Sequence, residues 1–291
     1  MPEQMNIQWF PGHMTKARRM IAENLKLIDA VCEIVDARIP YSSRNPDLDE
    51  MTGGKPRLII LNRADQADAD ATKRICEHLK KSGSAVLVTD SKSGRGVGGL
   101  SAALRSLLAE KLKRYEAKGQ KGRQLRAMVV GIPNVGKSSF INKAAGRKAA
   151  PTSDRPGVTR GKQWVGVDDG LELLDTPGVL WPRLDDSAVA ENLAFTGAIR
   201  DDIMDVETLG AILMERLKAQ YPEQLKQRYK IEIEPEAEGF DLLGHAAKKR
   251  GFLISGGEYD LNRMAIILLD EFRGGKLGRI TLERNIEALG N

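Results

Sequence analysis

One glycine-rich stretch is better suited to chemistry than any other part of the sequence. Residues 131–139 (GIPNVGKSS) fit the pattern GxxxxGK[ST], follow an apolar run (AMVV) and precede a helical pattern (SSFINKAA). In that context the motif forms a phosphate-binding loop, because small residues let backbone N–H groups surround phosphate oxygens at a helix N-terminus. Lys137 would reach the β- and γ-phosphates, and the Ser138 hydroxyl would bind Mg²⁺. The stretch assigned to the phosphates is Asn134, Val135, Gly136, Lys137, Ser138 and Ser139.

Two motifs downstream would complete the γ-phosphate and metal site. Asp175 begins the sequence DTPG at a strand end, where its carboxylate is suited to hold Mg²⁺ through water, and Gly178 can offer its N–H to the γ-phosphate. Between the two lies the turn-rich loop RPGVTR (155–160). Its Thr159 is the candidate second hydroxyl ligand of Mg²⁺, in a loop that would order around the γ-phosphate and relax after hydrolysis.

A third set of polar residues precedes the phosphate loop and is suited to bind a base. An apolar run at 57–61 ends in Asn62, Arg63 and Asp65, in the pattern N-R-x-D. The Asp65 carboxylate could accept from both guanine N1–H and N2–H₂, which adenine cannot offer. Asn62 would bond the base edge and the neighbouring phosphate loop, and Arg63 could cover a base face. Ser91 and Lys92, after the next strand, would flank the guanine O6; an ordinary strand-end turn remains the alternative for N-x-x-D.

The apolar patterning predicts the elements that position these motifs. Short apolar runs at 30–35, 57–61, 85–88 and 127–130, with helical patterns at 69–82 and 97–114, favour a parallel sheet covered on both faces. Residues 163–167 and 171–174, joined by Asp168, Asp169 and Gly170, predict an antiparallel hairpin. A helical pattern at 16–28 precedes the sheet. After about 184 only helical patterns follow, at 187–197, 206–218, 222–229, 240–250, 260–272 and 281–288.

The order of the motifs is unusual, since the base-binding pattern precedes the phosphate loop by about seventy residues. In a Ras-like sheet it follows. The fold class expected is therefore an α/β P-loop NTPase with a circularly permuted Ras-like GTPase sheet and an all-helical C-terminal domain. We expect residues 1–184 to form the GTPase domain, with 1–28 as an N-terminal extension, and residues 185–291 to form a separate helical domain.

Composition and charge limit the class of protein. Over 291 residues, 45 Lys and Arg against 40 Asp and Glu give a net charge of +5, which favours an anionic partner. Residues 105–126 hold eight Lys or Arg against two Glu, either as a solvated helix end or as a nucleic-acid contact. Cys32 and Cys76 lie far apart and are expected to be reduced core thiols. No apolar stretch approaches the ~18 residues of a membrane helix, and no leader pattern is seen, so a cytoplasmic location is expected.

Several motifs taken together resemble one known family. The stretch QWFPGHM (8–14), DARIP (36–40), NRAD, GIPNVGKSS, PGVTR, DTPG and the late GRITLE (278–283) match, in order, the circularly permuted GTPases of the YlqF type, the ribosome biogenesis GTPase A family. The resemblance covers nearly the whole chain. It implies GTP and GDP as ligands, a role in late assembly of the large ribosomal subunit, hydrolysis stimulated by the assembling particle, and a helical domain similar to ANTAR-type RNA-binding modules.

The resemblance also bears on catalysis, because Val179 occupies the position after DTPG where Ras-like enzymes place a water-orienting glutamine. The family's substitute is a histidine that maps to His13, which has suitable acid/base chemistry. His13 could instead shape its own loop or contact RNA. Asn134 matches the phosphate-loop asparagine that holds K⁺ in potassium-activated GTPases; a purely loop-stabilising amide is the alternative.

Two functions from different classes remain open at the level of sequence. The first is a GTPase that binds the large ribosomal subunit precursor, hydrolyses GTP to drive or check a late assembly step, and is monomeric off the ribosome. The second is a nucleotide-gated rRNA-binding chaperone in which hydrolysis is incidental. A tRNA-modification or ion-transport GTPase is disfavoured by the permuted order. Candidate RNA contacts on the helical domain are Lys248, Lys249, Arg250, Arg273, Lys276 and Arg279.

Overall fold

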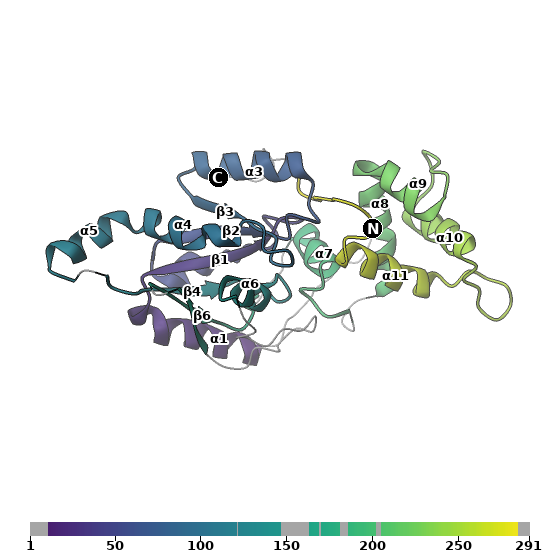
Figure 1. Cartoon of the computed structure of the whole chain (residues 1–291). Coiled ribbons are helices and arrows are strands. Elements are labelled where there is room, and N and C mark those ends of the chain that lie inside the picture. Colours follow the sequence, from purple (N-terminus) through teal and green to yellow (C-terminus); the bar gives the residue numbers. More distant parts are fainter. Residues whose placement is uncertain are drawn as a thin grey trace.

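A single six-stranded sheet organises the first half of the molecule (Figure 1). The computed structural model describes residues 11–120, 122–146, 163–168, 170–180, 186–201 and 205–284. In this part the strand order is β3-β2-β1-β4-β6-β5, and every neighbouring pair is parallel except β5 with β6. The strands are β1 (Ala30–Asp36), β2 (Arg57–Asn62), β3 (Ala85–Val88), β4 (Leu125–Val130), β5 (Gln163–Asp168) and β6 (Leu171–Asp175).

The central strands are apolar on both faces, because helices cover both. Val31 and Val35 of β1 point to one face, where helices α1 (Pro11–Asn24), α2 (Leu48–Thr52) and α3 (Ala69–Lys81) pack. The alternate positions of β1, such as Cys32 and Ile34, point to the other face and to α4 (Leu100–Leu107) and α6 (Lys137–Ala144). Short 3₁₀ turns lie at Leu25–Leu27 and Val97–Gly99, and α5 (Ala109–Ala117) extends α4.

The strand predictions and the hairpin prediction are confirmed. The four apolar runs fall within β1 to β4, and β5 pairs with β6 in antiparallel register, Trp164 facing Leu174. The base-binding pattern ends β2, and the phosphate loop follows β4. Moving β1 to β3 behind β6 in the sequence would restore the usual order of motifs without altering the sheet. The fold is thus the circularly permuted P-loop sheet that the motif order predicts.

Helices alone follow β6 in the described part of the chain, apart from one isolated bridge between Leu253 and Tyr259. Side chains of Asp186, Asp205 and Asp260 accept from backbone N–H groups in the first turns of three of them, which fixes where those helices begin. The helices are α7 (Ser187–Phe195), α8 (Val206–Gln220), α9 (Pro222–Tyr229), α10 (Gly239–Arg250) and α11 (Leu261–Arg273), here called the helical region. One apolar cluster continues from the sheet into it, and α7 lies between the two (Figure 1).

The prediction of a helix at 281–288 is wrong over its described residues, 281–284, which are not helical. The Ile280 N–H donates to Gln66 O and the Leu282 N–H to Arg38 O. Residues 277–284, here called the C-terminal segment, therefore lie as an extended strap against the loops that follow β1 and β2. These tertiary hydrogen bonds, together with the burial of Ile280 and Leu282, outweigh the local helical pattern.

Two composition-based expectations can also be compared with the structure. Cys32 is fully buried in β1, Cys76 is partly buried in α3, and both are free thiols. Burial raises the pKa of the Cys32 thiol to about 12, so it stays protonated. Among the described residues, no helix has the length and apolar character needed to cross a membrane.

Candidate nucleotide site

The loop after β4 is packed so closely that glycine is required at its two ends. A Cβ on Gly131 would lie 2.5 Å from Ile34 O, and one on Gly136, whose φ is +98°, would lie 2.6 Å from the Asn62 amide nitrogen. Gly178 of DTPG is equally confined, since its Cβ would lie 2.7 Å from the Pro133 nitrogen. The motifs at 131–139 and 175–178 are thus in direct contact, as a shared phosphate site requires.

Lys137 is buried at the start of α6 and is bonded to the loop itself. Its Nζ donates to Gly131 O at 3.1 Å and to Ile132 O at 2.8 Å. Burial lowers the pKa of Lys137 to about 8, although the nearby carboxylate of Asp175 acts in the opposite direction. These two bonds hold the amine over the loop, where a P-loop lysine meets the phosphates.

Asp175 and Ser138 form the other part of the phosphate half. The Ser138 Oγ lies 3.2 Å from Asp175 Oδ2, to which it donates. Asp175 is fully buried, and its Oδ1 accepts no hydrogen bond from the described residues. Burial raises the pKa of this carboxyl, against the charge of Lys137 and the bonds from Ser138 and Thr176. A buried carboxylate oxygen left over beside a hydroxyl is the donor set that a hydrated Mg²⁺ uses.

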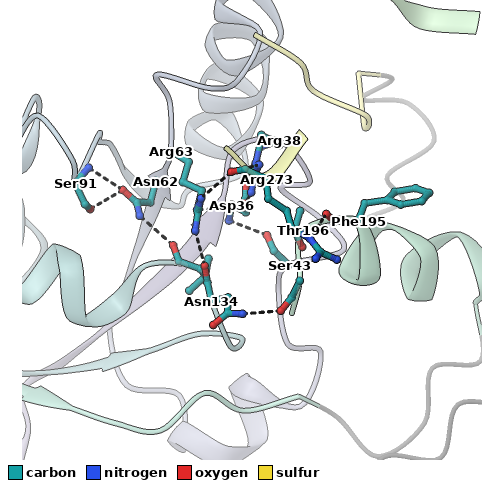
Figure 2. Close-up of polar contacts among 12 residues, drawn as sticks. Asp36, Arg38, Ser43, Asn62, Arg63, Ser91, Asn134, Phe195, Thr196 and Arg273 are labelled. Atoms are coloured by element: carbon teal, nitrogen blue, oxygen red, sulfur yellow. Dashed lines mark hydrogen bonds and ion pairs between the residues drawn. The ribbon is translucent and has the colours of Figure 1, made fainter. Parts of the chain in front are cut away.

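Asn62 is the centre of the base half of the site, at the end of β2 (Figure 2). Its Nδ2 donates to Val135 O at 3.0 Å, which ties the base motif to the phosphate loop. Its Oδ1 accepts from Thr89 Oγ1, from the Ser91 N–H and, at 2.6 Å, from Ser91 Oγ. The bond between Asn62 and the phosphate loop is the one that the sequence predicts. Ser91, which the sequence places beside the guanine O6, donates in the structure to Asn62.

The remaining base-site residues lie around this network. Asp65 is half-buried just beyond β2, and no described residue donates to its carboxylate. Lys92 is exposed on the turn after β3, and its N–H donates to Asp90 Oδ1. Asp90 also accepts from Ser93, and these hydrogen bonds lower the pKa of its carboxyl despite its burial. Sequence reasoning missed Asp90, which shapes the turn that carries Ser91 and Lys92.

Arg63 and Asn134 connect the site to the helical region (Figure 2). Arg63 has φ of +59° and Asn134 has φ of +58°, a left-handed backbone that non-glycine residues adopt at a cost. Arg63 Nη2 donates to Asn134 O at 2.8 Å and Nη1 to Arg273 O at 3.5 Å. The Asn134 Nδ2 donates to Gly197 O, just after α7, at 2.7 Å. The guanidinium of Arg63 is thus turned to the phosphate loop and to the end of α11.

Asp36 and Arg38 form a fully buried ion pair beside Arg63. Arg38 donates through Nε and Nη2 to both carboxylate oxygens of Asp36, at 2.9 and 2.7 Å, and through Nη1 to Phe272 O. Burial would raise the pKa of Asp36, but the charge and hydrogen bonds of Arg38 outweigh it and lower that pKa. The sequence motif DARIP marks this loop without indicating that Arg38 closes it onto α11.

The C-terminal segment bonds both to the loop after β1 and to α7, and so connects the two. Both carboxylate oxygens of Glu283 accept from this loop, from the N–H groups of Tyr41 and Ser42 and from the Ser42 hydroxyl. Asn192 of α7 donates to Glu283 and to Ser42, each at 3.1 Å. The loop after β1 is therefore fixed by residues more than a hundred positions away in the sequence.

The other predicted site residues divide between described and undescribed parts. Ser139 is exposed on α6, and Val179 is buried with its N–H on Gly131 O, so an apolar side chain does stand beside the phosphate loop. His13 belongs to the first turn of α1, but its side chain lies outside the described part of the structure. Thr159 and its loop lie outside the described residues altogether.

The sheet, the phosphate loop after its central strand and the asparagine network after the neighbouring strand define a class of protein. This chain is a circularly permuted P-loop GTPase, a hydrolase that binds guanine nucleotide. Residues 126–234 match the family model described as "50S ribosome-binding GTPase".

Comparison with known proteins then narrows the class to one family. Ribosome biogenesis GTPase A of Priestia megaterium is 48% identical over 98% of this chain and 99% of its own length. The protein of that name from Thermotoga maritima is 32% identical over 96% and 94%. The crystal structure of GNP-bound YlqF from T. maritima is similar with a TM-score of 0.64 at 29% identity, covering 92% of this chain and 98% of that one. The chain belongs to the ribosome biogenesis GTPase A family.

Proposed function

We propose that this GTPase binds the maturing large ribosomal subunit and hydrolyses GTP to drive or check a late step of its assembly. The names of its relatives support the ribosomal role, and the matching family is described as binding the 50S ribosome. In this proposal residues 1–184 act as the GTPase domain and 185–291 as the rRNA-binding domain. The protein works in the cytoplasm and is monomeric off the ribosome.

The observation that carries the proposal is the direct bonding between the nucleotide site and the helical region. Asn134 of the phosphate loop donates to Gly197 O, and Arg63 of the base motif donates to Arg273 O. A change at the phosphate loop on GTP binding or hydrolysis therefore alters the contacts of α7 and α11. Such a link lets bound RNA and bound nucleotide influence each other reciprocally.

The structure reduces the set of basic residues on the helical region that are candidates for rRNA contact. Arg250 pairs with Glu271, and Arg273 with Asp201, so both guanidinium groups already have partners. Exposed basic side chains remain on α10 and near the C-terminal segment, at Lys248, Lys249, Lys276 and Arg279. These four are the proposed phosphate contacts of this region.

The decisive experiment measures phosphate release with purified large-subunit precursors, with mature small subunits and with protein alone. We expect turnover to rise only with the precursors. GTP-dependent binding to precursors without any rise in turnover would instead support the second candidate, a nucleotide-gated assembly chaperone. The same bonded link between site and helical region favours that candidate, so turnover is what separates the two.

His13 is proposed to orient or deprotonate the attacking water, because Val179 cannot. His13→Ala should keep GTP affinity and lose turnover, with His78→Ala on the exposed side of α3 as the matched control. Normal turnover together with lost precursor binding would assign His13 to RNA contact instead.

Two cations complete the proposed site. Mg²⁺ would be held by Ser138, Thr159 and Asp175, where it would neutralise charge on the β- and γ-phosphates. K⁺ is proposed at Asn134, because a side-chain amide oxygen is a ligand that K⁺ accepts; the Nδ2 of the same amide donates to Gly197 O. Replacing KCl with NaCl at constant ionic strength should slow turnover in the natural chain but not in Asn134→Ala; equal rates in the natural chain would rule out this K⁺ site.

A further inference from the structure

The net positive charge of the chain is concentrated in one short segment. Residues 105–126 contain eight Lys or Arg and two Glu, a net charge of +6, whereas the whole chain carries +5. The other 269 residues therefore sum to −1. A charge excess in one place creates a local potential that average composition conceals.

The structure places this segment on a projection. Helix α5 has no buried residue, although Leu108 just before it is buried. In Figure 1 it extends from α4 beyond the sheet, at the end of the molecule opposite to α8–α11. We call residues 105–120 and 122–126 the basic arm. Leu112 of this nine-residue helix packs partly against the core, but most of the other side chains are exposed, and so short a helix gains little from that packing.

Contacts at the base of the basic arm fix its shape. Lys111 Nζ lies 2.7 Å from Asp29 Oδ1, and this carboxylate is almost fully buried below β1. Lys111 and Arg123 both lie over the ring of Tyr115, at 5.7 and 4.3 Å from its centroid. The linker that returns to β4 is thereby held against α5, and the basic side chains of helix and linker are kept together.

The outer side of the basic arm carries cations free for a partner. Lys113, Arg114 and Lys118 are exposed; Lys113 pairs only with the exposed Glu110, and in the described part of the chain neither Arg114 nor Lys118 has an ion pair. An exposed pair such as Lys113–Glu110 contributes little and yields readily to a stronger anion.

We propose that the basic arm is a second RNA-binding surface, which holds the phosphate backbone of an RNA helix in the ribosomal precursor. The chemistry indicates phosphate rather than base contact, since the one aromatic ring of the arm, Tyr115, already carries two cations and cannot stack freely on a base. The inference rests on the proposed function for its biological target. It adds that the GTPase contacts RNA at both ends of the molecule, with the nucleotide site between the two contacts.

The test compares two triple variants of the full chain that each neutralise two lysines and one arginine. Lys113→Gln with Arg114→Gln and Lys118→Gln removes the outer cations of the arm. Lys73→Gln with Arg74→Gln and Lys80→Gln removes three exposed cations from α3 and is the matched control. The probe is a fluorescent RNA duplex of about 30 base pairs, long enough for a shape-reading surface that spans roughly 16. Binding is followed by anisotropy from 50 to 200 mM KCl.

We expect the arm variant to bind the duplex roughly 10- to 100-fold more weakly at low salt, and the slope of log K against log salt to fall by about 2 to 3, one unit for each lost phosphate contact. The α3 control should match the natural chain, and all three proteins should hydrolyse GTP alone at one rate. Equal affinity and slope in the arm variant, or an equal loss in the control, would overturn the proposal.

Two further measurements separate the remaining outcomes. If duplex binding is unchanged but the arm variant loses binding to vesicles containing 30% phosphatidylserine, the arm binds anionic lipid and the RNA proposal is wrong. If the arm variant loses the duplex while large-subunit precursors fail to stimulate the natural chain, the arm inference stands and the proposed function falls. The two ideas can thus fail independently.

Discussion

The two halves of the nucleotide site differ in how complete they are. In the base half, Asn62 donates to Val135 of the phosphate loop and accepts from Thr89 and Ser91 of the neighbouring loop. In the phosphate half, Lys137 donates to carbonyls of its own loop, and Asp175 keeps a buried oxygen that no described residue bonds. The Asn62 network is built by neutral hydrogen bonds, whereas the phosphate half holds the buried charged groups of Lys137 and Asp175.

This difference indicates which half the nucleotide must rearrange. The amide and hydroxyl groups of the Asn62 network bond one another, so this part of the base half can be formed before any ligand arrives. A buried carboxylate oxygen without a donor, such as Asp175 Oδ1, is instead costly, and Mg²⁺ and phosphates would supply charges that complement Asp175 and Lys137. We therefore expect substitutions in the base half to affect folding and selectivity, and those in the phosphate half to affect catalysis.

Lys137→Ala should give the largest functional effect. Without the amine the charge that develops on the γ-phosphate loses a donor, and turnover should fall by roughly 10²- to 10³-fold. Without nucleotide the free energy of unfolding should change by no more than about 1 kcal/mol, because relief of the amine's desolvation offsets the loss of a donor to Gly131 O and Ile132 O. Steady-state phosphate release and urea unfolding measure the two quantities. Lys143→Ala, exposed on the same helix, is the control.

Asn62→Ala should instead lower the stability of the protein measured without nucleotide. It leaves Val135 O and the donors on Thr89 and Ser91 without their partner in a buried site, which should lower the free energy of unfolding by about 2–4 kcal/mol. Urea unfolding without nucleotide measures this. If Asn62→Ala were as stable as the natural chain, the base half would not be preformed, and the comparison between the halves would fail.

Asp65→Asn should change selectivity without changing stability. The half-buried carboxylate has no described donor, so its loss should alter the free energy of unfolding by less than about 0.5 kcal/mol. Loss of two charge-assisted bonds to guanine should weaken GDP roughly 10- to 100-fold, while xanthosine diphosphate binds better because its O2 complements the new amide. Competition binding of the two nucleotides reads the effect directly, and an unchanged preference would remove Asp65 from the base site.

The sequence predicts those parts of the site whose contacts are local in the chain and misses those whose partners are far apart in the chain. The phosphate loop, the β5–β6 hairpin and the polar ends of β2 and β3 are local patterns, and each could be read from a few adjacent residues. The bond of Arg38 to Phe272 O spans 234 positions and that of Ser42 to Glu283 spans 241. Nothing local to either residue marks its partner, since one partner is a backbone carbonyl at a helix end and the other is a glutamate far along the chain.

The failed helix prediction at 281–288 has the same origin. Residues 281–284 have a helical pattern, yet Thr281 and Glu283 are used to bond the loops after β1 and β2. Local propensity contributes only tenths of a kcal/mol per residue, so a few buried tertiary hydrogen bonds decide the backbone. Tertiary context therefore overrules sequence pattern where the C-terminal segment closes onto the loop after β1.

The pH dependence of nucleotide binding is the smallest expected effect and the most direct probe of the phosphate half. Burial lowers the Lys137 pKa from 10.5 to about 8 in the empty protein. Between these values the unfolded chain binds more protons than the folded one, so this residue makes the empty protein more stable as pH rises from 8 to 10.5. Phosphates need the charged amine, so GDP affinity should fall by about twofold from pH 7 to 8 and by up to about tenfold by pH 9. Fluorescent-GDP titrations measure it. Lys137→Arg is the control, because its side chain stays charged and any fall in its GDP affinity reflects ionisation of the guanine base alone. If GDP affinity fell in parallel in both proteins, the Lys137 amine would not be the titrating group.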